Sequence, residues 1–282
     1  MADSRFGIST HLFHDHLLTR DHLEAVAAHG FTTIELVATR THFDYRSDVA
    51  IDALAGWLSE TGLRVNSLHA PVGEAMRAGT WIGRFSTADT DEARRRAAVA
   101  EVELALRVAR RIPFDYLITH LGLPEASPPM GTDSRHAARR SVEEIAALAA
   151  AVNVRVALEV LPNAPASAPA LCTLLEDTLE DVDVGVCLDF GHAHLTGDLG
   201  DVIETLSGHI WATHLHDNRG RQDDHLVPFA GTIDWDAAMM ETQKVGYDGM
   251  LMFEVSGAGA PGEALRRAAR ARERLAGMLV VF

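Results

Sequence analysis

Short aliphatic runs alternate with longer segments of helical periodicity along the whole of this 282-residue chain. Each run has the length and the β-branched content of a buried strand, and a helix pattern follows it. This alternation is typical of βαβ units around a parallel sheet. The predicted strands are Phe6–Thr10, Thr32–Ala38, Arg64–Ala70, Tyr116–Leu121, Arg155–Leu161, Val184–Phe190, Ile210–His216 and Gly249–Val255.

Start and stop signals support the helices between these strands. Ser47 stands directly before one helical segment and Asp234 opens another, while Gly62 follows a helix end. The predicted helices are Asp21–His29, Asp48–Thr61, Thr90–Arg111, Ser134–Val152, Pro169–Glu180, Asp198–Leu206, Asp234–Lys244 and Gly262–Met278. Eight strand–helix pairs in a row predict an α/β protein with one (β/α)₈ TIM barrel, as a single domain over residues 1–282.

Composition limits the classes of partner. The chain has 25 basic and 40 acidic residues, a net charge of −15, which argues against broad contact with nucleic acid or an anionic membrane but leaves room for a local basic rim. We find no apolar signal core near Met1 and no apolar run long enough to span a bilayer, so we expect a soluble, cytoplasmic protein. The two cysteines, Cys172 and Cys187, form no CxxC pair and are expected to be reduced and without a chemical role.

Carboxylates inside apolar runs are the first sign of a functional site. Glu159, Asp189 and Glu254 each lie within a predicted strand, where an unpaired charge is costly to bury. Any one of them could form a structural ion pair, but three together at strand ends point to bound metal. The chain also has 15 histidines, and several of them fall at strand ends.

Nine candidate metal ligands result from this pattern. They are His69, His120, Glu159, Asp189, His192, His214, Asp223, His225 and Glu254. The carboxyl ends of barrel strands are where such folds build active sites, so these side chains are expected at one rim. Imidazole and carboxylate without thiolate suit Zn²⁺ or Mn²⁺, and also Fe²⁺ or Co²⁺, better than Ca²⁺ or Mg²⁺. Because one ion takes no more than about six ligands, nine candidates predict two or three ions, or one ion with neighbouring substrate-binding residues.

These residues, in this order, resemble a known family. The segments His69-Ala-Pro, His120-Leu-Gly, Cys187-Leu-Asp-Phe-Gly-His192, His214-Leu-His-Asp and Asp223-Asp-His225, with Glu159 and Glu254, are similar to the xylose isomerase-like TIM-barrel superfamily. That superfamily includes sugar isomerases and epimerases, inosose dehydratases and endonuclease IV. The resemblance covers nearly the whole chain and implies a metal-dependent enzyme with one to three divalent ions.

The epimerase-like members imply a first interpretation. In them a single ion is held by residues matching Glu159, Asp189, His214 and Glu254, and chelation of a ketose acidifies the C–H next to its carbonyl. One glutamate would take that proton and the opposite one would return a proton to an enediolate, which makes Glu159 and Glu254 the catalytic pair. The substrate would be a sugar, a polyol or a related hydroxy-ketone.

The endonuclease IV-like members imply a second interpretation. In them all nine matching positions hold three zinc ions, and the clustered ions hydrolyse a phosphodiester. This chain has every ligand but no evident basic insert for gripping DNA, although Arg40, Arg46, Arg77 and Arg84 could form a local basic rim. We rank the isomerase or epimerase first and the phosphodiesterase second. A noncatalytic barrel that binds metal and sugar for another subunit is the third hypothesis.

Loops after the strands supply the candidate substrate contacts. These are His11 after the first strand, Trp81 in the long loop Pro71–Ala88, and His192, Arg219 and Arg221. His216 alternates with His214 along one strand, so we predict that it points away from the barrel interior. Apolar loop residues such as Phe43 and Phe229 permit a homo-oligomer without requiring one.

Overall fold

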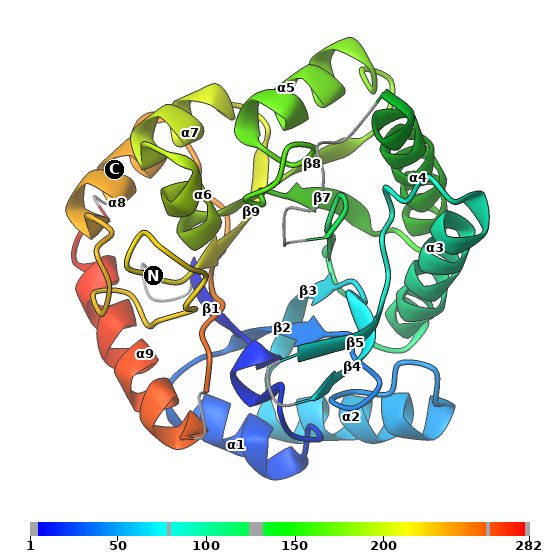
Figure 1. The fold of residues 1–282 in the computed structure, drawn as a ribbon. Helices are drawn as coiled ribbons and strands as arrows, with labels where there is room; N and C mark the ends of the chain where they lie inside the picture. Colours follow the sequence, from blue (N-terminus) through cyan, green and yellow to red (C-terminus); the bar gives the residue numbers. More distant parts are fainter. Residues whose placement is uncertain (1–4, 78–79, 124–131, 258–259, 280–282) are drawn as a thin grey trace.

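The eight predicted strands close into one parallel barrel, seen down its axis in Figure 1. The computed structural model describes residues 5–77, 80–123, 132–257 and 260–279. The strand order around the barrel is β1-β10-β9-β8-β7-β6-β3-β2. The barrel strands are β1 (Phe6–Ser9), β2 (Thr33–Val37), β3 (Arg64–His69), β6 (Tyr116–Thr119), β7 (Arg155–Glu159), β8 (Val184–Asp189), β9 (Ile210–Leu215) and β10 (Leu251–Phe253).

Helices surround the barrel on its outside, as predicted (Figure 1). Ser47 accepts a hydrogen bond from the Ala50 amide at the start of α2, and Gly62 ends that helix with φ of 71°. The helices are α1 (Arg20–Ala28), α2 (Asp48–Thr61), α3 (Glu92–Leu106), α4 (Thr132–Ala150), α5 (Ala168–Asp177), α6 (Phe190–Thr196), α7 (Leu199–Thr205), α8 (Trp235–Lys244) and α9 (Pro261–Ala276), with 3₁₀ turns η2 (Thr10–Phe13) and η3 (Arg107–Arg110). Among the described residues, none of these helices is both long and apolar enough to cross a membrane.

All eight barrel strands end earlier than predicted, and two of these ends matter for the site. We predicted a strand through Phe190, but β8 ends at Asp189, whose carboxylate caps the short helix α6 by accepting from the His192 amide at 2.6 Å. β9 ends at Leu215, so His216 lies beyond it. At the end of β8, a hydrogen bond from the backbone to a side chain thus accompanies the change from strand to helix.

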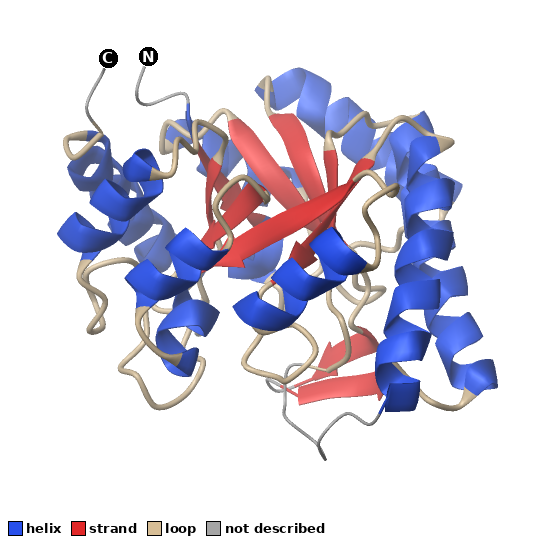
Figure 2. Ribbon diagram, turned by 90° about the horizontal axis from the view of Figure 1, so that it is seen from above, coloured by secondary structure: helices blue, strands red, loops and turns tan. Residues whose placement is uncertain are grey.

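The long segment after β3 contains a hairpin that the sequence did not reveal. β4 (Gly73–Arg77) and β5 (Thr80–Arg84) form an antiparallel pair within the predicted loop Pro71–Ala88. Figure 2 shows the pair set apart from the barrel strands. The Pro-rich stretch 123–131, which follows β6, lies outside the described residues apart from Leu123.

Small side chains fill part of the barrel interior. Ile118, Ala157, Cys187 and Ala212 form a buried cluster inside the barrel, separate from the larger core between the strands and the helices. The polar residues at the strand ends lie one or two positions further along the same strands. The core therefore fixes the strands directly beneath the candidate site.

The apolar loop residues offer less surface for a partner than the sequence suggested. Phe43 is buried, with 4% of its surface exposed, so it provides no docking face. Phe229 is half-buried beneath the guanidinium of Arg274, whose Cζ lies 3.7 Å from the ring centroid. A homo-oligomer remains a prediction, and Phe43 does not contribute to it.

Buried histidines near the first strand predict an acid-sensitive fold. The His42 ring is fully buried; its Nδ1–H donates to the His16 carbonyl at 2.7 Å, and its Nε2 has no hydrogen-bond partner among the described residues. Burial lowers the pKa of His42 to about 4, and the imidazole of His22 adds to this effect. Below pH 6.5 the unfolded chain therefore binds a proton that the folded chain does not, and stability falls as the pH falls.

We expect this difference in proton binding to lower the free energy of unfolding by about 2 kcal/mol between pH 7 and pH 5, as calculated from the pKa values of His42 in the folded and unfolded chain. His42→Gln, whose amide can still donate to the His16 carbonyl, should lose correspondingly less free energy of unfolding over that range. Urea unfolding at the two pH values measures this, with the exposed His136→Gln as the control. Equal acid-induced losses in the wild type and His42→Gln would contradict the prediction.

Candidate metal centre

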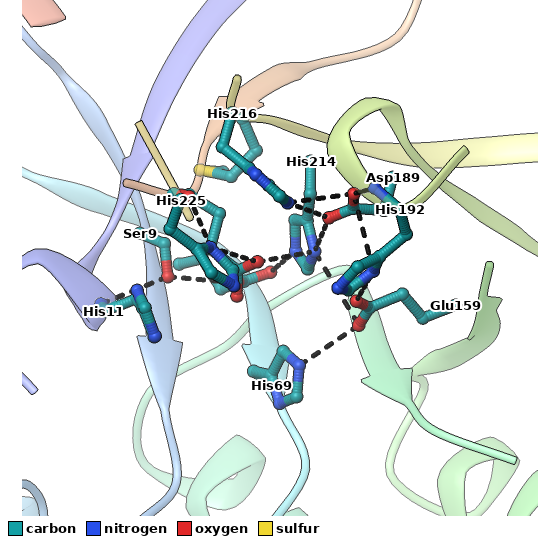
Figure 3. A network of polar contacts seen from close by, with 12 residues as sticks. Ser9, His11, His69, Glu159, Asp189, His192, His214, His216 and His225 are labelled. Carbon is teal, nitrogen blue, oxygen red and sulfur yellow. Dashed lines mark hydrogen bonds and ion pairs between the residues drawn. The ribbon is translucent and has the colours of Figure 1, made fainter. Parts of the chain in front are cut away.

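The nine candidate ligands gather at the carboxyl ends of the barrel strands, in the arrangement that Figure 3 shows in part. Glu159 and Asp189 are the last residues of β7 and β8, and His69 is the last of β3. His120 and Glu254 directly follow β6 and β10. Because parallel strands end at one rim of a barrel, residues far apart in sequence become neighbours here.

Four of these residues form a buried group, called here the four-ligand group. It consists of Glu159, Asp189, His214 and Glu254, and their ligand atoms lie within 4.8 Å of one another. Nδ1 of His214 faces all three carboxylates, at 3.7 Å from Glu159, 3.7 Å from Asp189 and 3.4 Å from Glu254. Three carboxylates therefore converge on one imidazole nitrogen.

A second group shares Glu159. Nε2 of His69 and Nε2 of His120 each lie 3.1 Å from Oε2 of Glu159. Figure 3 shows the His69 ring turned toward this carboxylate. Burial alone would lower the pKa of His69, but the hydrogen bond to Glu159 raises it to about 9. Glu159 thus connects the His69–His120 pair to the four-ligand group.

A third group lies on the other side of Asp189 and contains His192, His216, Asp223 and His225. Oδ2 of Asp223 accepts from Nε2 of both His192 and His225 at 3.0 Å. Asp223 and His225 lie in the loop after β9, and His225 adopts φ of 44°. All nine predicted ligands are therefore brought together in three adjoining groups.

His216 belongs to the third group, contrary to our prediction that it points away. Its Nε2 lies 2.9 Å from Oδ1 of Asp189, and its ring stacks on His225 with centroids 4.0 Å apart. The alternation argument failed because β9 ends before His216. Gly191 allows the ring this close, because a Cβ at that position would lie 2.0 Å from the imidazole.

Glu35 was missed altogether in the sequence analysis. It is fully buried on β2, and its carboxylate accepts from Ser9 Oγ at 3.0 Å, from Ser67 Oγ at 2.8 Å and from Nε2 of His214 at 3.0 Å. The signal was present, because Glu35 is a carboxylate inside the apolar run Thr33–Val37, as Glu159 is in its own strand. Its contact fixes Nε2 of His214 as the donor and directs Nδ1 toward the carboxylates.

The geometry around His214 fits a bound divalent cation. Nδ1 is buried and has no hydrogen-bond partner among the described residues, yet it faces three carboxylates that can only accept. A positive charge between these atoms satisfies this arrangement. In the ion-free protein a proton on Nδ1 supplies this charge. Burial lowers the pKa of His214, but the neighbouring Cys187 and Glu254 raise it well above its usual value. A metal ion with nitrogen and oxygen ligands would replace that proton.

A cavity of about 680 Å³ opens above these groups, which is a typical volume for a small-molecule site. Glu159, His192 and Glu254 line it, together with the predicted substrate contacts His11, Trp81 and Arg221. Arg219 is exposed and lies outside this lining.

Only part of the predicted basic rim lines the cavity. Arg84 lines the cavity, whereas Arg40 is engaged by Glu101 at 2.7 Å and by Glu74 at 3.3 Å. Arg46 is exposed and is not among the cavity-lining residues, and the side chain of Arg77 lies outside the described ones. Among the described arginines, Arg84 and Arg221 line the cavity.

A family model described as "Xylose isomerase-like TIM barrel" matches residues 23–276. The chain belongs to this family. Among curated relatives, the uncharacterized protein MJ1311 of Methanocaldococcus jannaschii is 25% identical over 261 residues, covering 90% of this chain and 84% of that protein. A putative hydroxypyruvate isomerase of Streptomyces coelicolor is 24% identical over 266 residues, covering 90% and 91%.

Solved structures share the fold along nearly the whole chain. A D-tagatose 3-epimerase-like protein superposes with a TM-score of 0.78 at 22% identity, covering 97% of this chain and 96% of the other. The IOLI protein with a bound zinc atom gives a TM-score of 0.78 at 18% identity, covering 99% and 100%. The xylose isomerase-like barrel is therefore shared even where the sequences have diverged widely.

Proposed function

We propose that this protein is a divalent-metal-dependent isomerase or epimerase that acts on a sugar or a related hydroxy-ketone. The observation that carries the proposal is the four-ligand group, in which Glu159 and Glu254 line the cavity on either side of His214. β7 and β10 are separated by β8 and β9 in the barrel, so the two carboxylates approach a bound molecule from different sides. The names of the Streptomyces relative and of the epimerase structures agree with this chemistry.

The two glutamates would carry out the proton transfers. A bound Zn²⁺ or Mn²⁺ supplies electrophilic polarisation of the substrate carbonyl. One of the pair, Glu159 or Glu254, takes the proton from the carbon next to the carbonyl, and the other returns a proton to the opposite face. His192 and His11 line the cavity and can hydrogen-bond substrate hydroxyls, and Arg221 can contact substrate oxygens at the rim.

A second candidate function is a multi-zinc phosphodiesterase, and one observation favours it. The His69–His120–Glu159 group and the group around Asp223 are both complete and adjoin the four-ligand group, so the chain offers positions for three ions. Clustered ions can stabilise both the attacking and the leaving oxygens of a phosphodiester. The role of His192 differs between the two candidate functions, because it would contact substrate in the first and a metal ion in the second.

Metal content distinguishes these functions before a substrate is known. We expect elemental analysis of protein purified without added metal to find about one tightly held ion at the barrel mouth, because the four-ligand group by itself supplies the four donors that one ion needs. Interconversion of ketoses in a panel assay should accompany it. Two or three tightly held zinc ions together with hydrolysis of an abasic-site or aryl phosphodiester would overturn the proposal in favour of the second candidate.

A further inference from the structure

Three metal-type ligands also meet on the outside of the barrel, away from its mouth. Cys172 and Glu176 lie on α5, and His209 lies in the turn just before β9. Their ligand atoms are within 4.8 Å of one another. We propose that these residues form a separate binding site for a thiophilic divalent cation such as Zn²⁺. This inference does not depend on the proposed function.

The backbone already holds the three donors in place. Cys172 and Glu176 are four residues apart on α5, which puts them on one face of the helix. Nε2 of His209 lies 3.0 Å from Oε1 of Glu176. The His209 backbone is fixed at both ends, because its amide donates to the Leu206 carbonyl and its carbonyl accepts from the Val186 amide. A cation could replace the proton shared by these side chains without any movement of the main chain.

The donor chemistry selects the class of cation. Sulfur, imidazole nitrogen and carboxylate oxygen together are typical ligands of zinc and do not suit Ca²⁺ or Mg²⁺. Glu176 has 57% and His209 has 29% of its side-chain surface exposed, so an ion can enter from solvent and keep water in its fourth position. Cys172 is half-buried. The site therefore has three protein ligands and an open side.

The local charge also favours a cation. Burial raises the pKa of the Cys172 thiol, and the carboxylates of Glu176 and Asp177 raise it further, which keeps the thiol protonated in the ion-free protein. The same carboxylates attract a divalent ion, and a coordinating ion favours the thiolate. Metal binding would therefore displace a proton from Cys172.

This site is independent of the barrel mouth. His209 precedes β9 and His214 lies near its other end, which separates them by about 17 Å at the rise of an extended strand. No donor is shared between the two places. A bound ion would link α5 to the start of β9, and it would add one weakly held ion to any metal count made with excess zinc.

Protection of the Cys172 thiol tests the proposal on the intact, metal-loaded protein. Cys187 is fully buried, so an aromatic disulfide reagent should react with Cys172 alone in the folded state. We expect added Zn²⁺ to slow this reaction about tenfold or more, because a coordinated thiolate is a poor nucleophile. Added Cd²⁺ should produce the ultraviolet charge-transfer absorption of a thiolate–metal bond.

Variants show whether all three donors take part. His209→Ala and Glu176→Gln should lose the protection, Cys172→Ser should lose the Cd²⁺ absorption, and all three should keep the wild-type turnover and melting temperature. The matched control is His136→Ala, an exposed histidine on α4. Absence of protection in the wild type would overturn the proposal. Equal protection in wild type and His209→Ala would also overturn it, because zinc would then bind the thiol without the imidazole.

Discussion

Glu254→Gln is expected to lower turnover of the preferred ketose by about 10²–10⁴-fold, the usual contribution of one general acid or base. The metal should stay bound, because Glu159, Asp189 and His214 remain as ligands and the amide oxygen of Gln can still contact the ion. An amide, however, cannot take or return a proton. Glu254 is also positioned for this role, since it lines the cavity and is 4% exposed.

The measurement combines steady-state kinetics with elemental analysis of the same sample. Glu159→Gln should lose turnover to a similar extent, and its metal content shows whether ion binding depends on the carboxylate that His69 and His120 share. Glu24→Gln, an exposed glutamate on α1, is the matched control. Full activity in Glu254→Gln would exclude proton transfer by this residue. No turnover by the wild type on sugar and phosphodiester panels would favour the noncatalytic barrel.

Glu35→Gln is expected to weaken metal binding about 10–100-fold, as found when a carboxylate that orients a ligating histidine is removed. The physical reason is the orientation of His214. With the Glu35 carboxylate in place, Nε2 donates and Nδ1 points at Glu159, Asp189 and Glu254. A neutral amide holds that imidazole less firmly and permits the other tautomer, in which Nδ1 carries the proton.

Competition with a chromophoric chelator measures the affinity, and ¹⁵N chemical shifts of the His214 ring report its tautomer directly. Ser67→Ala is the graded control, because it removes one donor to Glu35 but leaves the carboxylate. We expect it to weaken metal binding less than Glu35→Gln does. The same affinity and the same tautomer in Glu35→Gln and wild type would show that Glu35 is needed only for packing.

The site residues differ in how visible they were in the sequence. Glu159, Asp189 and Glu254 stood out because a carboxylate in an apolar strand needs a partner, and the strands themselves are regular enough to predict. Glu35 has the same local signal but lies within a strand to which no motif drew attention. Its role depends on Ser9, Ser67 and His214, three residues from three other strands.

Features that depend on hydrogen bonding at strand ends were harder to predict. The β4–β5 hairpin lies in a segment whose turn residues resemble those of a loop, and α6 begins where Asp189 can act both as a strand residue and as a helix cap. The predicted orientation of His216 was wrong for the same reason, because strand alternation applies only as far as the strand continues.

The sequence by itself determined the eight-stranded barrel, the approximate limits of its strands and the rim at which the ligand-type residues lie. These follow from local periodicity and from the single direction of parallel strands. Only the tertiary structure decided how the ligands divide into three adjoining groups, that Glu159 joins two of them, and that Glu35 orients His214. Such relations depend on distances of 3–4 Å between strands far apart in the chain, and these distances are set by the register and closure of the barrel.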